Sequence, residues 1–496
     1  MARINRLIRI DAPGSQRTPA TASFPGASCI GSGRKVGVRP QVGVHPLAAG
    51  LIFWALIGIV GPIGAVAASA AEHSVPATAD VSATVKWAAI PARTVMLFYP
   101  GQSSYQWLRG PGHPAGATAV AGGAPCSACH LGQEAVLGER IVAGGPLEPE
   151  PIPGKRGAIE IRVQAAYDSE RLYLRFQWPT QAERPGQVHD FLRYDGQRWA
   201  PFGGPRSKPE VRSGSMPPLY EDRLAIALDD GRVPSFDRQG CWLACHDGTR
   251  DMPRQPPTEQ VRAHGLLGQL LGQEDVRKYL PDTRDDKTAS WDRTKPADVI
   301  AELKAAGIFL ELMQWRAARS NPVGMADDGY VLEYRLSDAG VGPFASNLDR
   351  KTMTPRYMFD PARAGFQALT LEQIADRSEP YALIREDNTA PYDPDAGWQV
   401  GDLLPSRVLS RAGAQGSAAD NRDVVGSWEQ GTWTVVWARP LDTGNPEDDK
   451  QLRPGERYTV SFSVHDDNVT SRFHHVSFPL TLGIGVDADV TAARVE

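Results

Sequence analysis

The chain has 496 residues, of which 53 are Lys or Arg and 58 are Asp or Glu, so its formal net charge is −5. This mildly acidic balance argues against nucleic acid as a partner. The length allows one large domain or two smaller ones, and 49 glycines with 41 prolines predict many turns and few long helices.

The first 70 residues have the composition of an export signal. Residues 1–46 carry seven Lys or Arg against one acid and show no periodicity, so we expect a basic disordered leader in which Cys29 has no functional role. Residues 47–70 are uncharged and almost wholly apolar, which is typical of a signal-peptide core or a membrane anchor. Ala68-Ser69-Ala70 favours cleavage. The positive flank predicts that the remainder crosses to the periplasm.

Two short motifs hold four of the five cysteines, and each ends in Cys-His: Cys126-Ser-Ala-Cys129-His130 and Cys241-Trp-Leu-Ala-Cys245-His246. The first has the C-x-x-C-H spacing at which two thiols meet the vinyl groups of one porphyrin while the histidine faces the iron. The second has one extra residue, a rarer spacing. We therefore predict two covalent c-type haems with His130 and His246 as iron ligands. Structural zinc, disulfides and a redox-active thiol pair are the alternatives.

Strand patterns dominate from residue 154 onward. Ile159, Ile161 and Val163 alternate with polar residues, and a turn at 168–170 leads to a second strand at 172–178, which predicts a hairpin. Further strands are predicted at 223–229, 308–315, 330–334, 432–438, 458–465 and near 474–482, with the clearest helix at 296–307. The fold class is thus mainly β, a β-sandwich over 154–496 with a few short helices. Residues 71–153 form a loop-rich segment that carries the first motif, and 253–295 and 376–428 are predicted loops.

From about Gly154 to Gly485 the chain resembles the ethylbenzene dehydrogenase-related haem-binding domain family. The resemblance rests on Val163–Asp168 with Leu172–Arg175, Glu221–Arg223, Gly240–His246, Gln314–Arg316, Ala438–Gly444, Val464–Asp467 and His474–Pro479. It implies a β-sandwich that holds a haem between the region after the Glu-Asp-Arg strand and the last strand. Cytochrome subunits of periplasmic molybdenum enzymes in this family use a methionine and a lysine there.

This chain departs from the family at both ligand positions. His246 and its two cysteines stand at the first, and His474-His-Val-Ser477 stands at the second. The resemblance therefore implies His474 as the sixth ligand of haem 2, with His475 as the fallback, because neighbours on a strand face opposite sides. For haem 1 the candidates are His113, close in sequence to His130, then His189 and Met96. The sequence is also compatible with an additional, non-covalent haem b.

Two imidazoles per iron leave no open coordination position, which favours electron relay over catalysis. The leading hypothesis is a periplasmic dihaem c-type cytochrome that passes electrons between a respiratory donor and a terminal oxidoreductase. The alternative is a haem enzyme, a dihaem peroxidase or oxyanion reductase with one open haem. The expected partner is a molybdenum oxidoreductase or a membrane quinol-oxidising cytochrome. After cleavage, residues 71–496 carry 46 Lys and Arg against 57 Asp and Glu, a charge of −11 that suits a basic partner, although solubility alone explains it equally well.

Overall fold

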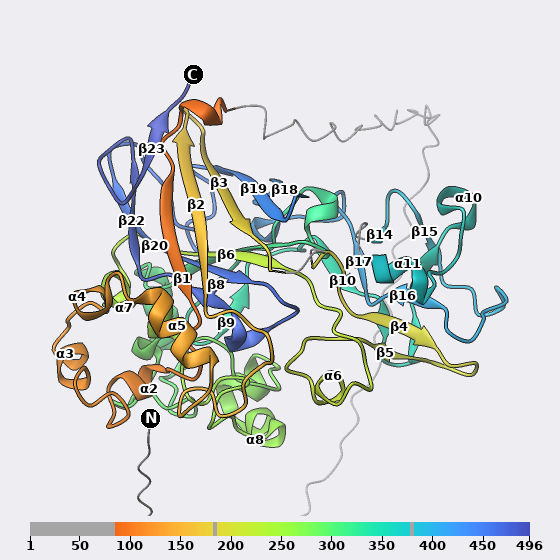
Figure 1. Cartoon of the computed structure of the whole chain (residues 1–496), viewed down its shortest axis with the longest axis horizontal. Coiled ribbons are helices and arrows are strands. Elements are labelled where there is room, and N and C mark those ends of the chain that lie inside the picture. Colours follow the sequence, from red (N-terminus) through yellow and green to blue (C-terminus); the bar gives the residue numbers. More distant parts are fainter. Residues whose placement is uncertain (1–84, 182–185, 377–380) are drawn as a thin grey trace, which may run out of the picture. The chain divides into compact units, whose positions relative to one another are not determined.

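The computed structural model describes residues 85–181, 186–376 and 381–496 (Figure 1). The predicted leader, the apolar segment 47–70 and its cleavage pattern lie outside these ranges. Among the described residues, no helix has both the length and the apolar character needed to cross a membrane.

A 13-stranded sheet organises the structure and confirms the mainly β prediction. Its strands are β1 (Arg93–Phe98), β2 (Ala158–Tyr167), β3 (Arg171–Pro179), β6 (Arg223–Asp229), β7 (Leu310–Arg316), β8 (Gly329–Val331), β9 (Arg335–Ser337), β18 (Asp423–Glu429), β19 (Thr432–Pro440), β20 (Arg457–His465), β21 (His475–Val476), β22 (Leu480–Ile484) and β23 (Val490–Arg494). They follow the order β18-β19-β3-β2-β1-β21-β20-β6-β7-β8-β9. In addition, β22 and β23 join β20 to β2 by a second route.

The two halves of this sheet pack against each other through large side chains. Trp178 of β3 meets Trp315 of β7 edge-on, with ring centroids 6.1 Å apart, and Phe176 of β3 meets Phe462 of β20 at 5.2 Å. In β2, the isoleucines and valine of the alternating pattern are buried in the same core, whereas Glu160 and Arg162 between them are exposed. The period-2 pattern therefore predicted the buried face correctly.

Most predicted elements have counterparts, and the hairpin of β2 and β3 is confirmed by their antiparallel pairing. The helix predicted at 296–307 is α9 (Ala297–Ala305), which begins directly after Pro296. The continuous strand predicted near 474–482 is wrong, because Pro479 has no amide hydrogen and β21 ends before it. The pairing with β20 resumes in β22 with its register changed by one residue, as in a β-bulge.

Short strands fill part of the stretch predicted as loop at 376–428. They form three small sheets with a hydrophobic cluster of their own. The strands of these and a further two-stranded sheet are β4 (Phe191–Tyr194), β5 (Trp199–Phe202), β10 (Phe344–Ser346), β11 (Leu348–Asp349), β12 (Thr354–Pro355), β13 (Tyr357–Phe359), β14 (Leu383–Ile384), β15 (Thr389–Pro391), β16 (Leu403–Pro405) and β17 (Arg407–Leu409). The stretch 253–295, predicted as loop, contains α8 (Thr258–Ala263), a π-helix at Gly265–Leu270 and a short 3₁₀ helix at Pro281–Thr283.

The segment that carries the first motif supplies β1 to the main sheet, antiparallel to β2. Its helices are α2 (Tyr105–Leu108), α3 (Ala117–Ala121), α4 (Ser127–His130) and α5 (Glu134–Val142). They gather beside α7 (Phe236–Gln239), which leads into the second motif (Figure 1). The remaining short helices are α6 (Pro209–Arg212), α10 (Pro361–Ala364) and α11 (Leu371–Asp376).

Candidate haem-binding sites

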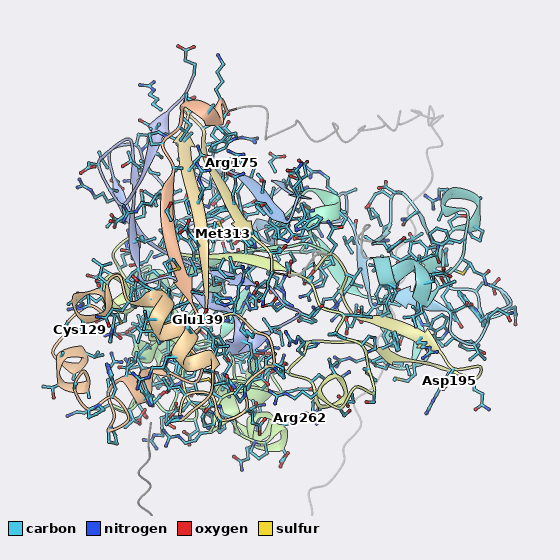
Figure 2. All side chains as sticks on the ribbon, in the orientation of Figure 1. Cys129, Glu139, Arg175, Asp195, Arg262 and Met313 are labelled. Atoms are coloured by element: carbon cyan, nitrogen blue, oxygen red, sulfur yellow. The ribbon has the colours of Figure 1, made fainter. Side chains whose placement is uncertain are left out.

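The first Cys-His motif lies on the short helix α4 at the protein surface. Cys129 is exposed and lies among these short helices, well away from Met313 in the core (Figure 2). Cys126 is half-buried, and its amide donates a hydrogen bond to the carbonyl oxygen of Arg238 over 3.2 Å. Burial raises the pKa of the Cys126 thiol. One thiol of the motif therefore faces inward and the other outward.

His113 and His130 face each other beside this motif. Their ring centroids lie 6.2 Å apart, with the planes tilted by 31°. Two imidazoles bound to opposite sides of one metal ion at about 2 Å have centroids about 6 Å apart, so the separation fits one iron between them. Gly116 makes this possible, because a methyl group there would lie only 2.0 Å from the His113 ring.

Hydrogen bonding orients His113 in the manner of a metal ligand. Its Nδ1 lies 3.1 Å from the carbonyl oxygen of Leu108, an acceptor that places the proton on Nδ1 and leaves the Nε2 lone pair available. Trp107 stacks on the ring at 5.1 Å. On the other side, Nδ1 of His130 is buried and has no hydrogen-bond partner in the described parts of the chain.

The second motif begins at a glycine that the geometry requires. Gly240 has φ +52°, which favours glycine, and a Cβ there would lie 2.6 Å from Oγ of Ser461. The short helix Gly240–Ala244 follows and places Cys241 and Cys245 on the wall of a cavity. Burial raises the pKa of both thiols, an effect that the nearby Lys278 ammonium partly offsets.

This cavity lies against one face of the main sheet. Alternate residues of three neighbouring strands form much of its wall: Arg223, Ala225 and Ala227 of β6, Leu310, Leu312 and Gln314 of β7, and Ser461, Ser463 and His465 of β20. The intervening residues of β6 and β20 point into the main core. Small alanine and serine side chains on one face of the sheet thus leave the space that the cavity occupies.

Positive charge concentrates on the cavity wall. It comes from Arg223, Lys278 and Arg472, together with Arg250, Arg277 and Arg335. Nη2 of Arg223 is buried without a hydrogen-bond partner among the described residues, and burial lowers the pKa of this guanidinium to about 10. Guanidinium groups pair well with carboxylates, so this lining fits the two propionates of a haem. Two thiols, apolar strand residues and a basic lining together fit the porphyrin. Most of the basic groups also pair with carboxylates of the chain, as Arg472 does with Glu148 at 2.7 Å.

His474 lines the cavity, whereas His475 does not. Nδ1 of His474 bonds the carbonyl oxygen of Ser471, and its Nε2 has no partner in the described residues. Burial lowers the pKa of His474 to about 3, so the ring is neutral and able to bind a metal. His475 points away, with Nε2 2.9 Å from the carbonyl oxygen of Arg156. The two neighbours therefore face opposite sides, as alternation along a strand requires.

His246 lies outside the cavity wall in this arrangement. It is fully buried, stacked on Tyr279 at 3.8 Å, and its Nε2 lies 3.0 Å from the carbonyl oxygen of that residue. Its Nδ1 lies 3.0 Å from Nε2 of Gln106. Burial holds the pKa of His246 well below its usual value. Both ring nitrogens are engaged, so His246 must give up one hydrogen bond to bind iron.

Two other histidines are placed differently from the expectation. His189 lies against Tyr220 and pairs with Asp190, in surroundings that the structure does not connect with the first motif. His465 was not predicted from the sequence as part of a haem site. It lines the cavity with its Nδ1 lacking a partner among the described residues, and its ring lies 4.6 Å from that of His474. The alternation of β20, with Ser461, Ser463 and His465 on one face, is the signal in the sequence that indicates this position.

Comparison with known proteins identifies the family of this chain. A family model described as ethylbenzene dehydrogenase matches residues 86–477, a range that contains both motifs and the cavity. The chain belongs to this family. Cytochrome c-552 of Stutzerimonas stutzeri is 26% identical over 419 residues, which cover 84% of this chain and 93% of that protein. Cytochrome c-551 of Rhodocyclus tenuis is 30% identical over 170 residues, or 34% of this chain and 57% of that protein. Family and relatives support a haem-related role with haem c, in electron transfer or catalysis.

Proposed function

We propose that this ethylbenzene dehydrogenase family member is a periplasmic c-type cytochrome with two covalent haems, which relays single electrons between a respiratory donor and a terminal oxidoreductase. The observation that carries the proposal is the cationic cavity that both thiols of the second motif border and that His474 enters with a free Nε2. Haem supplies one-electron chemistry at its iron, and the chain supplies attachment, ligands and surroundings.

At the first site, Cys126 and Cys129 hold the porphyrin, and His130 and His113 bind its iron. The 6.2 Å between the two rings supports this pair. Each ligand would be a neutral imidazole, and two imidazoles give a lower reduction potential than an imidazole with a methionine. With both imidazoles bound, the iron would have no coordination position open to a substrate, which favours electron relay over catalysis.

At the second site, Cys241 and Cys245 would hold the porphyrin, and His474, which lines the cavity, would bind its iron. His465 does not serve as the opposite ligand, because its ring lies 4.6 Å from that of His474, too close for two imidazoles on opposite sides of an iron at about 6 Å. We assign the opposite position to His246, which exchanges its hydrogen bond with Tyr279 for the iron.

Both attachment sites border one small aromatic cluster, which supports transfer between the haems. Phe98, Trp242 and Phe478 contact one another with centroids 5.2 to 5.9 Å apart. Cys126 and Cys241 both pack against this cluster. The two covalent attachments therefore lie on the same packed unit, and electrons would leave through the first haem, whose Cys129 is exposed.

The partner that we propose is a basic redox protein, either a molybdenum oxidoreductase or a membrane quinol-oxidising cytochrome. The charge of −11 on residues 71–496 supports a basic surface on that partner. Periplasmic export rests on the apolar segment 47–70 and on the place where covalent haem is attached.

The test is a His474→Ala variant of the full chain, purified with its haems. We expect pyridine haemochrome analysis to show two covalent haems per chain in both proteins. Electron paramagnetic resonance should show two low-spin haems in the parent and a new high-spin signal in the variant, because the second iron loses a ligand.

Two further variants sharpen this test. His264→Ala removes a histidine that bonds Leu267 and Asp292 outside both sites, and it should keep both low-spin signals. Cys241→Ala should weaken covalent attachment of the second haem. An unchanged spectrum in His474→Ala contradicts the ligand assignment, and a high-spin haem in the parent would favour the haem enzyme instead.

A further inference from the structure

A group of buried carboxylates lies on the side of β7 away from the haem cavity. Glu311 is on β7, Asp328 directly precedes β8, and Asp449 lies in the loop between β19 and β20. One carboxylate oxygen of each lies within 4.8 Å of the others. Their side chains are buried, although carboxylates are rarely buried without partners.

Two more buried aspartates adjoin this group. Asp338 follows β9, is 5% exposed and faces the carboxylate of Asp328. Neither oxygen of Asp338 receives a hydrogen bond from any described residue, and the same holds for both oxygens of Asp449. Asp448 is also buried and receives hydrogen bonds at one oxygen only, from Ser417 and from the amide of Ala339. Acceptor atoms without donors therefore converge here from two segments of the chain, whereas Asp328 accepts hydrogen bonds from the amide of Gly329 and from Asn421.

The basic side chains nearby already have partners, and one of them pairs with Glu311 of this group. Arg439 pairs with both oxygens of Glu311 at 2.8 Å. The ammonium of Lys450 turns away to Asp230, at 2.6 Å, and to Asp229, at 3.5 Å. Within the described ranges, no Lys or Arg forms an ion pair with Asp328, Asp338, Asp448 or Asp449. Four carboxylates thus share a buried region without a cation of their own.

Such a cluster is stable only if protons or a metal ion compensate the charge. The oxygens of Asp338 and Asp449 have no hydrogen-bond donor among the described residues, so the side chains present do not supply this compensation.

We propose that Glu311, Asp328 and Asp449, with Asp338 and Asp448 beside them, form a Ca²⁺ site. The donors are all oxygens, which select a hard cation over zinc. Ca²⁺ binds oxygens at about 2.3–2.6 Å, so its ligands lie at most about 5 Å apart, in agreement with the 4.8 Å limit here. Mg²⁺ keeps several waters and a strict octahedron, which suits a buried all-protein cluster less well.

Ca²⁺ in this position would tie the loop before β20 to the strands β7, β8 and β9. Leu310 and Leu312, on either side of Glu311, line the haem cavity. The ion would therefore stabilise a wall of that cavity from behind, without contact with the haem. This inference does not depend on the electron-relay function.

The test measures Ca²⁺ binding and melting of the purified, haem-loaded full chain after treatment with a chelator. CaCl₂ at about 1 mM should restore one Ca²⁺ per chain and raise the melting temperature by about 3 °C, as expected for a chain of this size at 100 times Kd. MgCl₂ at the same concentration should give a clearly smaller rise. Asp395→Asn, an exposed position, is the control and should behave as the parent.

Asp449→Asn and Asp338→Asn give the decisive comparison. In chelator, both variants should melt at or above the parent temperature, because each removes a repelled buried charge. In CaCl₂ they should melt below it and bind Ca²⁺ at least tenfold more weakly. Absence of bound Ca²⁺ in the parent, an equal response to Mg²⁺, or unchanged Ca²⁺ binding in both variants would overturn the proposal.

Discussion

At the scale of single residues, four histidines differ in which ring nitrogen forms a hydrogen bond with a backbone carbonyl oxygen. His113 and His474 use Nδ1, at Leu108 and Ser471, and so keep Nε2 for a metal. His246 and His475 use Nε2, at Tyr279 and Arg156. Metal-binding histidines are commonly held by such a bond at the second ring nitrogen. This difference supports His113 and His474 as the preoriented ligands.

Asp222 provides a prediction about pH at the same scale. Its Oδ2 accepts hydrogen bonds from Nε1 of Trp433 at 2.9 Å and from the amide of Gly186 at 3.0 Å. Burial, assisted by repulsion from Asp466, raises the pKa of Asp222 to about 7. The folded state therefore binds this proton more tightly than the unfolded state. Its contribution to stability should fall as the pH rises from about 4 to about 7, by at most about 1.4 kcal/mol per pH unit.

Asp222→Asn should remove this contribution, because the neutral amide keeps an oxygen acceptor for Trp433 and Gly186. We expect the free energy of unfolding of the parent to fall more between about pH 5 and pH 8 than that of the variant. Denaturant unfolding at both pH values measures the difference. Asp237→Asn, at an exposed position, should keep the pH dependence of the parent. Equal pH dependence in parent and Asp222→Asn would contradict the assignment.

Part of the candidate site could be predicted from residue types and their spacing in the sequence. The two motifs follow from the sequence because the attachment chemistry fixes their spacing. The hydrogen-bond partners of His246 do not, because Gln106 and Tyr279 are distant in sequence and meet it only in the folded chain. The basic cavity wall was missed for the same reason, since its residues come from separate strands and loops.

Among elements, the alternation of β6 separates core from cavity. Leu224, Ile226 and Leu228 pack in the main core, whereas Ala225 and Ala227 face the cavity. Enlarging Ala227 to leucine should fill part of the space that a porphyrin needs, while the cost of overpacking stays at about 1–3 kcal/mol. We expect the haem content of Ala227→Leu to fall from two towards one per chain.

The neighbouring position provides a matched control for this prediction. Ile226→Val changes the opposite face of β6 and should cost about 0.5–1.5 kcal/mol of stability without loss of haem. Pyridine haemochrome analysis, with peptide mapping of the haem attached at Cys126 and Cys129, measures both outcomes. Two haems per chain in Ala227→Leu would show that the cavity does not hold the second haem.

Strands with clear alternation and turn residues were predictable, because one buried face leaves a pattern in the sequence. The pairing of β17 with β10 and β14 could not be predicted. Strands of two or three residues show no periodicity, and their pairing depends on partners that are distant in the sequence. The bulge between β21 and β22 was also missed, although Pro479 is a signal that a strand is interrupted. Register changes depend on the partner strand, which the local sequence does not specify.

At the scale of the whole molecule, the segment that carries the first motif packs against the β-domain and contributes a strand to its sheet. The amide of Tyr105 donates to the carbonyl oxygen of Cys245 over 2.7 Å, and Nε2 of Gln106 contacts His246. With β1 in the main sheet, these contacts bring the two motifs onto one aromatic cluster. The sequence predicted two haem sites, but their common packing requires the fold.

The net charge of residues 71–496 gives a prediction about encounters with redox partners. A charge of −11 on residues 71–496 attracts cations over distances near the Debye length, which falls from about 30 Å at 0.01 M salt to about 8 Å at 0.15 M. The dithionite-reduced protein should therefore be oxidised by the cation tris(phenanthroline)cobalt(III) several-fold more slowly at the higher salt concentration. Stopped-flow absorbance of the haems measures the second-order rate constant.

Ferricyanide, an anionic oxidant, is the matched control, and its rate constant should rise over the same range because salt screens repulsion. Opposite salt dependences for the two reagents mean that charge steers partners to the exposed haem, as expected for a basic protein partner. Salt dependences of the same sign would show that the charge serves solubility alone. That result would remove the support for a basic partner but would leave the ligand assignments at both haems intact, because these rest on the geometry of the histidines.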